Sequence, residues 1–144
     1  MKEQNFANHV RVVPPFHMVA LPILLMNFLW AIYRLVHTWF SFDALVALLL
    51  AIALILVALF ARMFALTVQD RVIRLEMRQR MERLLPADLK TRFDEFTVSQ
   101  LVALRFASDA ELPELARRVL AEKIEDRKAI KRMIKTWKPD YLRA

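Results

Sequence analysis

The sequence predicts an all-α protein, in which a transmembrane helical hairpin is followed by a long linker helix and a small cytosolic helical bundle. Two apolar runs, 18–33 and 44–61, lie ten residues apart, and the second contains no charged residue. At about 1.5 Å per residue the second run spans roughly 27 Å, close to the thickness of the hydrocarbon core of a bilayer. The chain also has no glycine, which disfavours β-hairpins and phosphate-binding loops.

Charge is distributed unevenly along the chain, because only four of the 22 Lys and Arg residues lie within residues 1–66. The first apolar run is longer than the core of a signal peptide, and no small-residue cleavage site follows it, so we expect it to be retained. The expected segments are a cytosolic N-terminal segment (1–15), a first transmembrane helix (16–36), a short outer loop (37–43), a second transmembrane helix (44–66) that continues as a linker helix to residue 85, and a cytosolic helical domain (86–144).

Positive charges near the two apolar helices predict their orientation. The expected outer loop has no Lys or Arg, whereas Lys2 and Arg11 precede the first helix and four arginines follow the second. Lys and Arg in short flanking segments stay on the cytoplasmic side, so both termini are expected in the cytoplasm. Arg34, at the loop end of the first helix, is the exception.

Alanines on the second apolar helix predict a packing face, which we call the alanine seam. They recur mostly at spacings of three and four residues: Ala44, Ala47, Ala51, Ala58, Ala61 and Ala65. Small side chains allow helices to approach closely, and lipid supplies no hydrophobic drive between them. The partner could be the first helix or the same helix of a second copy, which would give a homodimer. Alanine is common in membrane helices, so a chance pattern is the competing interpretation.

Beyond the apolar helices, amphipathic patterns predict short helices that pack as a bundle. Ile73, Met77, Met81 and Leu84 form one apolar stripe on the linker helix. Thr97 with Gln100, and Ser108 with Glu111, have the spacing of capping boxes. Asp126 is expected to cap a last helix that extends through Trp137.

This last helix is expected to carry a basic face, formed by Lys128, Lys131, Arg132, Lys135 and Lys138. Such a face suits the anionic surface of membrane lipid. A protein partner and plain solvent are the alternatives. Nucleic acid is disfavoured, because acidic residues are interspersed and no recognition motif is present.

The composition also limits the chemistry expected of the chain. It has no cysteine, which removes disulfides, thiolate catalysis and cysteine-based metal sites. The three histidines, His9, His17 and His37, are expected near opposite membrane faces, so they cannot converge on one metal ion. We therefore expect no catalytic residue, no metal and no cofactor, and do not expect an enzyme.

Five phrases of the sequence carry a family resemblance: QNFxNH (4–9), VPPFH (13–17), FALxVQDRVIRLE (64–76), QLVALRFASD (100–109) and DRKAIK (126–131). Together they resemble a family of small bacterial membrane proteins described only as a domain of unknown function. The resemblance implies two membrane spans in the bacterial inner membrane and carries over no catalytic residues. Any shared role would lie at the inner interface and in the cytosolic helices.

These observations favour a non-catalytic interaction or scaffolding subunit that presents residues 101–109 and 112–138 to a larger protein. One alternative is a membrane-surface sensor or regulator that binds anionic lipid through the basic last helix. A second is an accessory subunit of a membrane enzyme complex, in which His9 or His17 completes a site on another chain.

Overall fold

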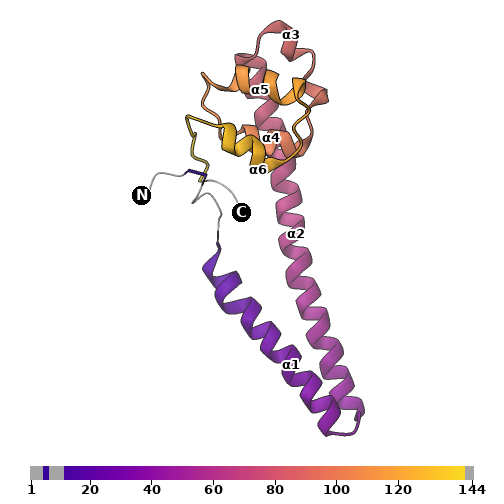
Figure 1. Cartoon of the computed structure of the whole chain (residues 1–144). Coiled ribbons are helices and arrows are strands. Elements are labelled where there is room, and N and C mark those ends of the chain that lie inside the picture. The colour runs from indigo at the N-terminus through magenta and orange to yellow at the C-terminus, as the bar shows by residue number, and fades with distance from the viewer. Residues whose placement is uncertain (1–4, 7–11, 142–144) are drawn as a thin grey trace. The chain divides into compact units, whose positions relative to one another are not determined.

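The computed structural model describes residues 5–6 and 12–141, and all regular structure within these residues is helical. The all-α prediction is therefore confirmed (Figure 1). The chain divides into two units, and helix α2 (Phe42–Leu84) contributes to both. The hairpin unit comprises described residues 12–65, and the bundle unit comprises described residues 5–6 and 66–141.

The hairpin unit contains both apolar runs. A π-helical segment, Pro15–Ala20, leads into helix α1 (Leu21–His37), and a short turn connects α1 to α2. The helices Pro15–His37 and Phe42–Leu84 are each long and apolar enough to cross a membrane. The buried side chains of this unit lie toward the turn, at Ala31, Leu35, Ala44 and Ala51.

The turn between α1 and α2 closes without glycine. The Phe40 N–H donates to the Leu35 carbonyl at 2.9 Å, and the Trp39 N–H to the Val36 carbonyl at 3.3 Å. This is the Schellman pattern, whose left-handed position is usually glycine. Trp39 occupies that position with φ 50°. The Ser41 hydroxyl then accepts from the Ala44 N–H at 3.4 Å, which satisfies one donor at the start of α2.

In the bundle unit, the last part of α2 is surrounded by short helices (Figure 1). These are α3 (Ala87–Lys90), a 3₁₀ turn at Phe93–Glu95, α4 (Val98–Leu104), α5 (Leu112–Ala121) and α6 (Arg127–Met133). The expected stripe on α2 forms one side of the core, because Ile73, Met77 and Met81 are buried. Leu84 is half-buried against the same core. The other side includes Leu89, Phe93, Leu101, Leu104, Leu112, Val119 and Ile130.

Two of the three predicted helix caps are confirmed. Thr97 and Gln100 form a complete capping box at the start of α4. The Asp126 carboxylate accepts from the Lys128 and Ala129 N–H groups, which starts α6. Both caps depend only on residues within one turn of each other, so their sequence patterns are sufficient to specify them.

The capping box predicted at Ser108 and Glu111 is only half formed. The Ser108 hydroxyl accepts from the Glu111 N–H at 3.3 Å. The Ser108 N–H, however, donates to the Thr136 carbonyl at 3.0 Å. The Glu111 carboxylate instead accepts from the Lys135 and Thr136 N–H groups at 2.8 and 3.0 Å. The Ser108 N–H and the Glu111 carboxylate, which would bond to each other in a complete capping box, therefore both bond to the backbone of residues 135–136.

The prediction that the last helix extends through Trp137 is wrong, since α6 ends at Met133. The following residues turn extended: Trp137 forms an antiparallel bridge with Ala107. The Lys138 N–H donates to the Phe106 carbonyl at 2.7 Å. The rings of Trp137 and Phe106 also stack with their centroids 4.7 Å apart. This pairing replaces the hydrogen bonds that another turn of helix would have provided.

Candidate functional site

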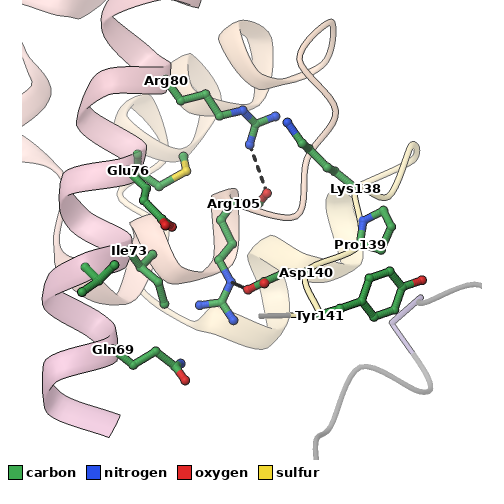
Figure 2. A pocket seen from close by; sticks show the side chains of 11 residues that line it. Gln69, Ile73, Glu76, Arg80, Arg105, Lys138, Pro139, Asp140 and Tyr141 are labelled. Carbon is green, nitrogen blue, oxygen red and sulfur yellow. Dashed lines mark hydrogen bonds and ion pairs between the residues drawn. The ribbon is translucent and has the colours of Figure 1, made fainter. Parts of the chain in front are cut away.

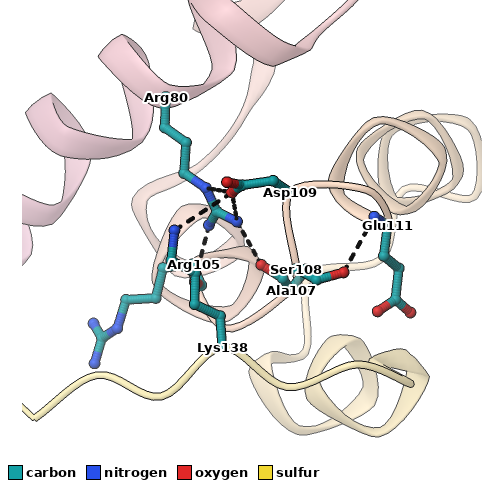
Figure 3. Close-up of polar contacts among 7 residues, drawn as sticks. All are labelled: Arg80, Arg105, Ala107, Ser108, Asp109, Glu111 and Lys138. Carbon is teal, nitrogen blue, oxygen red and sulfur yellow. Dashed lines mark hydrogen bonds and ion pairs between the residues drawn. The ribbon is translucent and has the colours of Figure 1, made fainter.

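Arg80 on α2 is the centre of a polar cluster in the bundle unit (Figure 3). Its guanidinium donates to the carbonyls of Arg105 and Ala107 at 3.0 and 2.6 Å, and to the Asp109 carboxylate at 2.8 Å. The two carbonyls follow the last turn of α4, where a cation also interacts favourably with the helix dipole. The Arg80 side chain is only 11% exposed. Arg80 therefore holds α4 and the loop after it against α2.

Asp109 extends this cluster to the segment after α6. Its carboxylate also lies 3.4 Å from the Lys138 ammonium. The hydrogen bond from Arg80 is the main cause that lowers the pKa of Asp109, and the positive charges of Arg80 and Lys138 lower it further. Asp109 is thus an anion at neutral pH and bridges two cations from distant parts of the chain.

A cleft of about 420 Å³ lies beside this cluster. Figure 2 shows Ile73 and Glu76 of α2 on one side of it and Pro139 and Tyr141 on the other. Apolar side chains, among them Ile73, contribute to the lining. The charged lining consists of Glu76, Arg80, Arg105, Lys138 and Asp140. The cleft is therefore both apolar and charged, with one more basic than acidic side chain.

Arg105 is a second largely buried basic residue that lines the cleft. It follows α4 directly, and its side chain is 10% exposed. The guanidinium lies 4.6 Å from the centre of the Phe106 ring, a cation–π arrangement. The Arg105 Nε is 3.0 Å from an Asp140 carboxylate oxygen (Figure 2). A guanidinium in this setting can bind a planar carboxylate through two parallel hydrogen bonds.

The five basic residues predicted to share one helix face do not do so. Lys128, Lys131 and Arg132 lie on α6, whereas Lys135 and Lys138 lie beyond its end. Lys131 lies over the Phe106 ring at 5.1 Å, and Arg132 over the Phe6 ring at 5.7 Å. With Lys138 paired to Asp109, three of the five basic side chains already have partners in the bundle unit.

Within the hairpin unit, the alanine seam divides into two parts. Ala44 and Ala51 are buried, and Ala47 and Ala58 are half-buried. Ala61 and Ala65 are exposed, and the half-buried positions near them include Ile55 and Arg62. A pattern with a period of 3.5 residues drifts by about 20° per heptad around a straight helix, which explains the change of face. Contact with a second copy through this seam stays a prediction.

The histidines are placed by local contacts. His9 lies outside the described residues. His17 Nδ1 is 3.1 Å from the Val13 backbone nitrogen. His37 packs edge-on against Tyr33, with the ring centroids 5.5 Å apart. Among residues 5–6 and 12–141, no three His, Asp or Glu side chains are grouped as metal ligands would be.

Comparison with known proteins identifies the family of this chain. All of residues 1–144 match a family described as a family of unknown function, DUF6526. The chain belongs to DUF6526. This confirms the resemblance to a family of unknown function that the sequence phrases indicated. No curated protein and no solved structure matches this DUF6526 chain.

The sequence did not single out Arg80, Arg105 or Asp140 as site residues in this DUF6526 chain. Arg80 lies 25 and 27 residues from the carbonyls it contacts, so no local pattern announces the contacts. Arg105 lies inside the phrase 100–109, which was the one available signal. It is a charged residue at the end of an otherwise apolar segment, and a charge that becomes buried there requires an ion-pair or hydrogen-bond partner.

Proposed function

We propose that this DUF6526 protein is a non-catalytic interaction subunit, anchored in the bacterial inner membrane by its hairpin, with both termini in the cytoplasm. The bundle unit would bind a partner protein in the cleft between α2 and the segment 138–141. The observation that carries this proposal is the combination, in one cleft, of apolar side chains and firmly held charged groups. Binding sites of proteins commonly have this mixed lining.

An exposed apolar stripe on α2 supports a protein partner. Val68, Val72 and Leu75 follow the apolar part of the helix, are spaced four and three residues apart, and are all exposed. Residues at these spacings lie on one helix face. Val72 also lines the cleft, so the stripe and the cleft are continuous. Arg105 and Tyr141 add two residue types that are enriched at the centres of interfaces.

Binding of anionic lipid through a basic face of the last helix is less well supported. It requires five basic side chains on one helix face, but α6 carries three of them, and one of those lies over a buried ring. Anionic lipid could still attract Lys128 and Lys135, which are exposed. Such an attraction of about 1 kcal/mol per charge would orient the bundle unit without selecting a partner.

Photo-crosslinking in intact cells tests the proposal. A benzophenone side chain at Val72 should form an adduct with one defined protein, whereas the same group at the exposed Ala121 of α5 should not. The double variant Val72→Glu and Leu75→Glu should then abolish co-purification of that protein and leave the thermal unfolding of the bundle unit unchanged. Lipid adducts alone at position 72, or the same proteins at both positions, would contradict the proposal.

A further inference from the structure

The Arg105 side chain is preorganised to bind a carboxylate in the free chain. Arg80 fixes the Arg105 carbonyl at 3.0 Å, and the Phe106 ring lies 4.6 Å from the Arg105 guanidinium. The side chain is 10% exposed, so its charge is only slightly screened by water. A side chain held in this way loses little conformational freedom when it binds an anion.

The carboxylate at Arg105 comes from the chain itself. Asp140 lies two residues after Lys138, the residue whose N–H is hydrogen-bonded to the Phe106 carbonyl at 2.7 Å. The intervening Pro139 has no N–H and cannot extend this pairing. The Asp140 side chain is half-buried, and its carboxylate lies 3.0 Å from the Arg105 Nε. The segment 138–141 thus forms one wall of the cleft and places the Asp140 carboxylate beside Arg105.

We infer that the Arg105 end of the cleft is a carboxylate-binding subsite for an acidic segment of the partner protein, and that Asp140 fills this subsite in the free chain. The inference rests on the proposed function and names the chemistry that the partner must supply. An aspartate or glutamate of the partner replaces Asp140, and its neighbouring apolar side chains contact the exposed Val72 and Tyr141. Asp140 is then a built-in competitor that keeps the site closed to weak ligands.

The surrounding charges favour a carboxylate over a more highly charged anion. Arg80 and Lys138 are paired with Asp109, whereas Arg105 is paired with Asp140, the acid that a ligand carboxylate would replace. Glu76 also lines the cleft, and it would repel a dianionic phosphate more strongly than a single carboxylate. A guanidinium and a carboxylate are complementary in shape and charge, and the Arg105 Nε lies 3.0 Å from an Asp140 carboxylate oxygen.

The test uses the full chain in phosphatidylcholine nanodiscs, labelled with 3-fluorotyrosine. The chain has two tyrosines, so Tyr141 reports on the cleft, and Tyr33 of α1 serves as the internal reference. The probe is a blocked tetrapeptide that copies residues 138–141, and its control has asparagine in place of the aspartate. The acidic peptide should shift the fluorine resonance of Tyr141 and leave that of Tyr33 in place. The asparagine peptide should need at least about ten times the concentration, the loss expected for one charge-assisted pair.

Two variants determine whether the subsite is as inferred. Asp140→Asn removes the competitor and should lower the half-saturating concentration of the acidic peptide about tenfold. Arg105→Lys keeps the positive charge but loses the planar fork of the guanidinium. This variant should raise the half-saturating concentration of the acidic peptide by a similar factor. Equal binding of the two peptides, or no effect of Asp140→Asn, would overturn the inference. The inference would also be overturned if Arg105→Lys bound the acidic peptide as tightly as the unaltered chain and had the same unfolding temperature.

A matched control is available in the same unit. Asp94→Asn makes the same chemical change at an exposed carboxylate that is ion-paired with Arg74 at 3.6 Å, and it should leave peptide binding unchanged. The two proposals fail in different ways. A protein adduct at Val72 combined with no effect of Asp140→Asn contradicts only the carboxylate subsite. Peptide binding at Arg105 without a protein adduct at Val72 contradicts only the interaction function in cells.

Discussion

At the scale of single residues, Arg80 shows how one side chain can join three segments. The guanidinium contacts two backbone carbonyls and one carboxylate while remaining almost fully buried. Such a group is costly to remove, because its acceptors are left without a donor. The contacts also require the planar fork of arginine, which lysine cannot reproduce.

We predict that Arg80→Ala destabilises the bundle unit by about 2–4 kcal/mol and Arg80→Lys by about 1–2 kcal/mol. Thermal unfolding of the detergent-solubilised protein, followed by circular dichroism, measures the difference. Arg83→Ala is the control, because Arg83 is an exposed arginine on the same helix and its loss should change little. Equal effects at the two positions would show that the Arg80 contacts do not stabilise the fold.

Asp109 predicts a dependence of stability on pH. Arg80 lowers its pKa below the ordinary value of 3.8. The stabilising contribution is therefore fully present above about pH 4 and is lost as the pH falls through the lowered pKa. Because the side chain is 57% exposed, screening keeps this contribution below about 1 kcal/mol. In urea titrations, the stability difference between the unaltered chain and Asp109→Asn should be smaller at about pH 3 than at about pH 6. Equal differences at the two pH values would contradict this account.

Residue roles could be predicted from sequence only where the partners are close along the chain. Thr97 and Asp126 were predicted as caps because each bonds to backbone within three residues. Glu111 was placed in a local cap, but its carboxylate binds backbone 24 and 25 residues away. The pairs of Arg80 and Arg105 are of the same distant kind. Which distant groups meet depends on how the helices pack, and packing leaves no local pattern.

At the scale of elements, α2 needs two different faces along one continuous helix. In the hairpin unit its buried positions are alanines, and in the bundle unit they are Ile73, Met77 and Met81. The first type allows close approach of a helix, whereas the second fills a core. The sequence predicted both stripes, but a strict 3.5-residue register placed Ala61 and Ala65 on the packing face, where the structure has them exposed.

We predict that Ala51→Leu weakens the hairpin unit by about 1–3 kcal/mol, since Ala51 is buried and a larger side chain would force α2 away from its neighbour. Ala65→Leu, the same change at an exposed position, is the control and should leave unfolding in SDS titrations unchanged. If Ala65→Leu instead lowers the fraction of dimer in native mass spectrometry, the exposed part of the seam contacts a second copy. Equal unfolding of both variants and the unaltered chain would refute a packing role for Ala51.

The end of α5 offers a prediction of increased stability. Lys123 has φ 50° at the left-handed position of a Schellman motif, in which the Ile124 N–H donates to the Val119 carbonyl at 3.1 Å. Glycine has no Cβ and meets this conformation without strain, so Lys123→Gly should stabilise the bundle unit by about 0.5–1 kcal/mol. Lys128→Gly, within α6, should destabilise it by a similar amount. A lower unfolding temperature for Lys123→Gly would rule out strain at this position.

At the scale of the whole molecule, composition predicted the two helices and the fold class, because hydropathy and helical period are properties of continuous segments. The cleft could not be predicted in the same way. It depends on the extended residues after Met133, where a basic, amphipathic sequence favours helix but pairing with Ala107 and Phe106 prevails. Tertiary contacts that override local propensity have no signature in a single sequence.

The orientation of the chain in the membrane is a further prediction, because it rests on the distribution of Lys and Arg around the apolar helices. The chain has no cysteine, so an introduced cysteine is the only reactive thiol. Thr38→Cys places it in the turn between α1 and α2, and Glu122→Cys at the exposed end of α5. In intact bacterial cells with a permeable outer membrane, an impermeant maleimide should label position 38 but reach position 122 only after lysis. The reverse pattern would place the cleft, and with it the site for a partner, outside the cytoplasm.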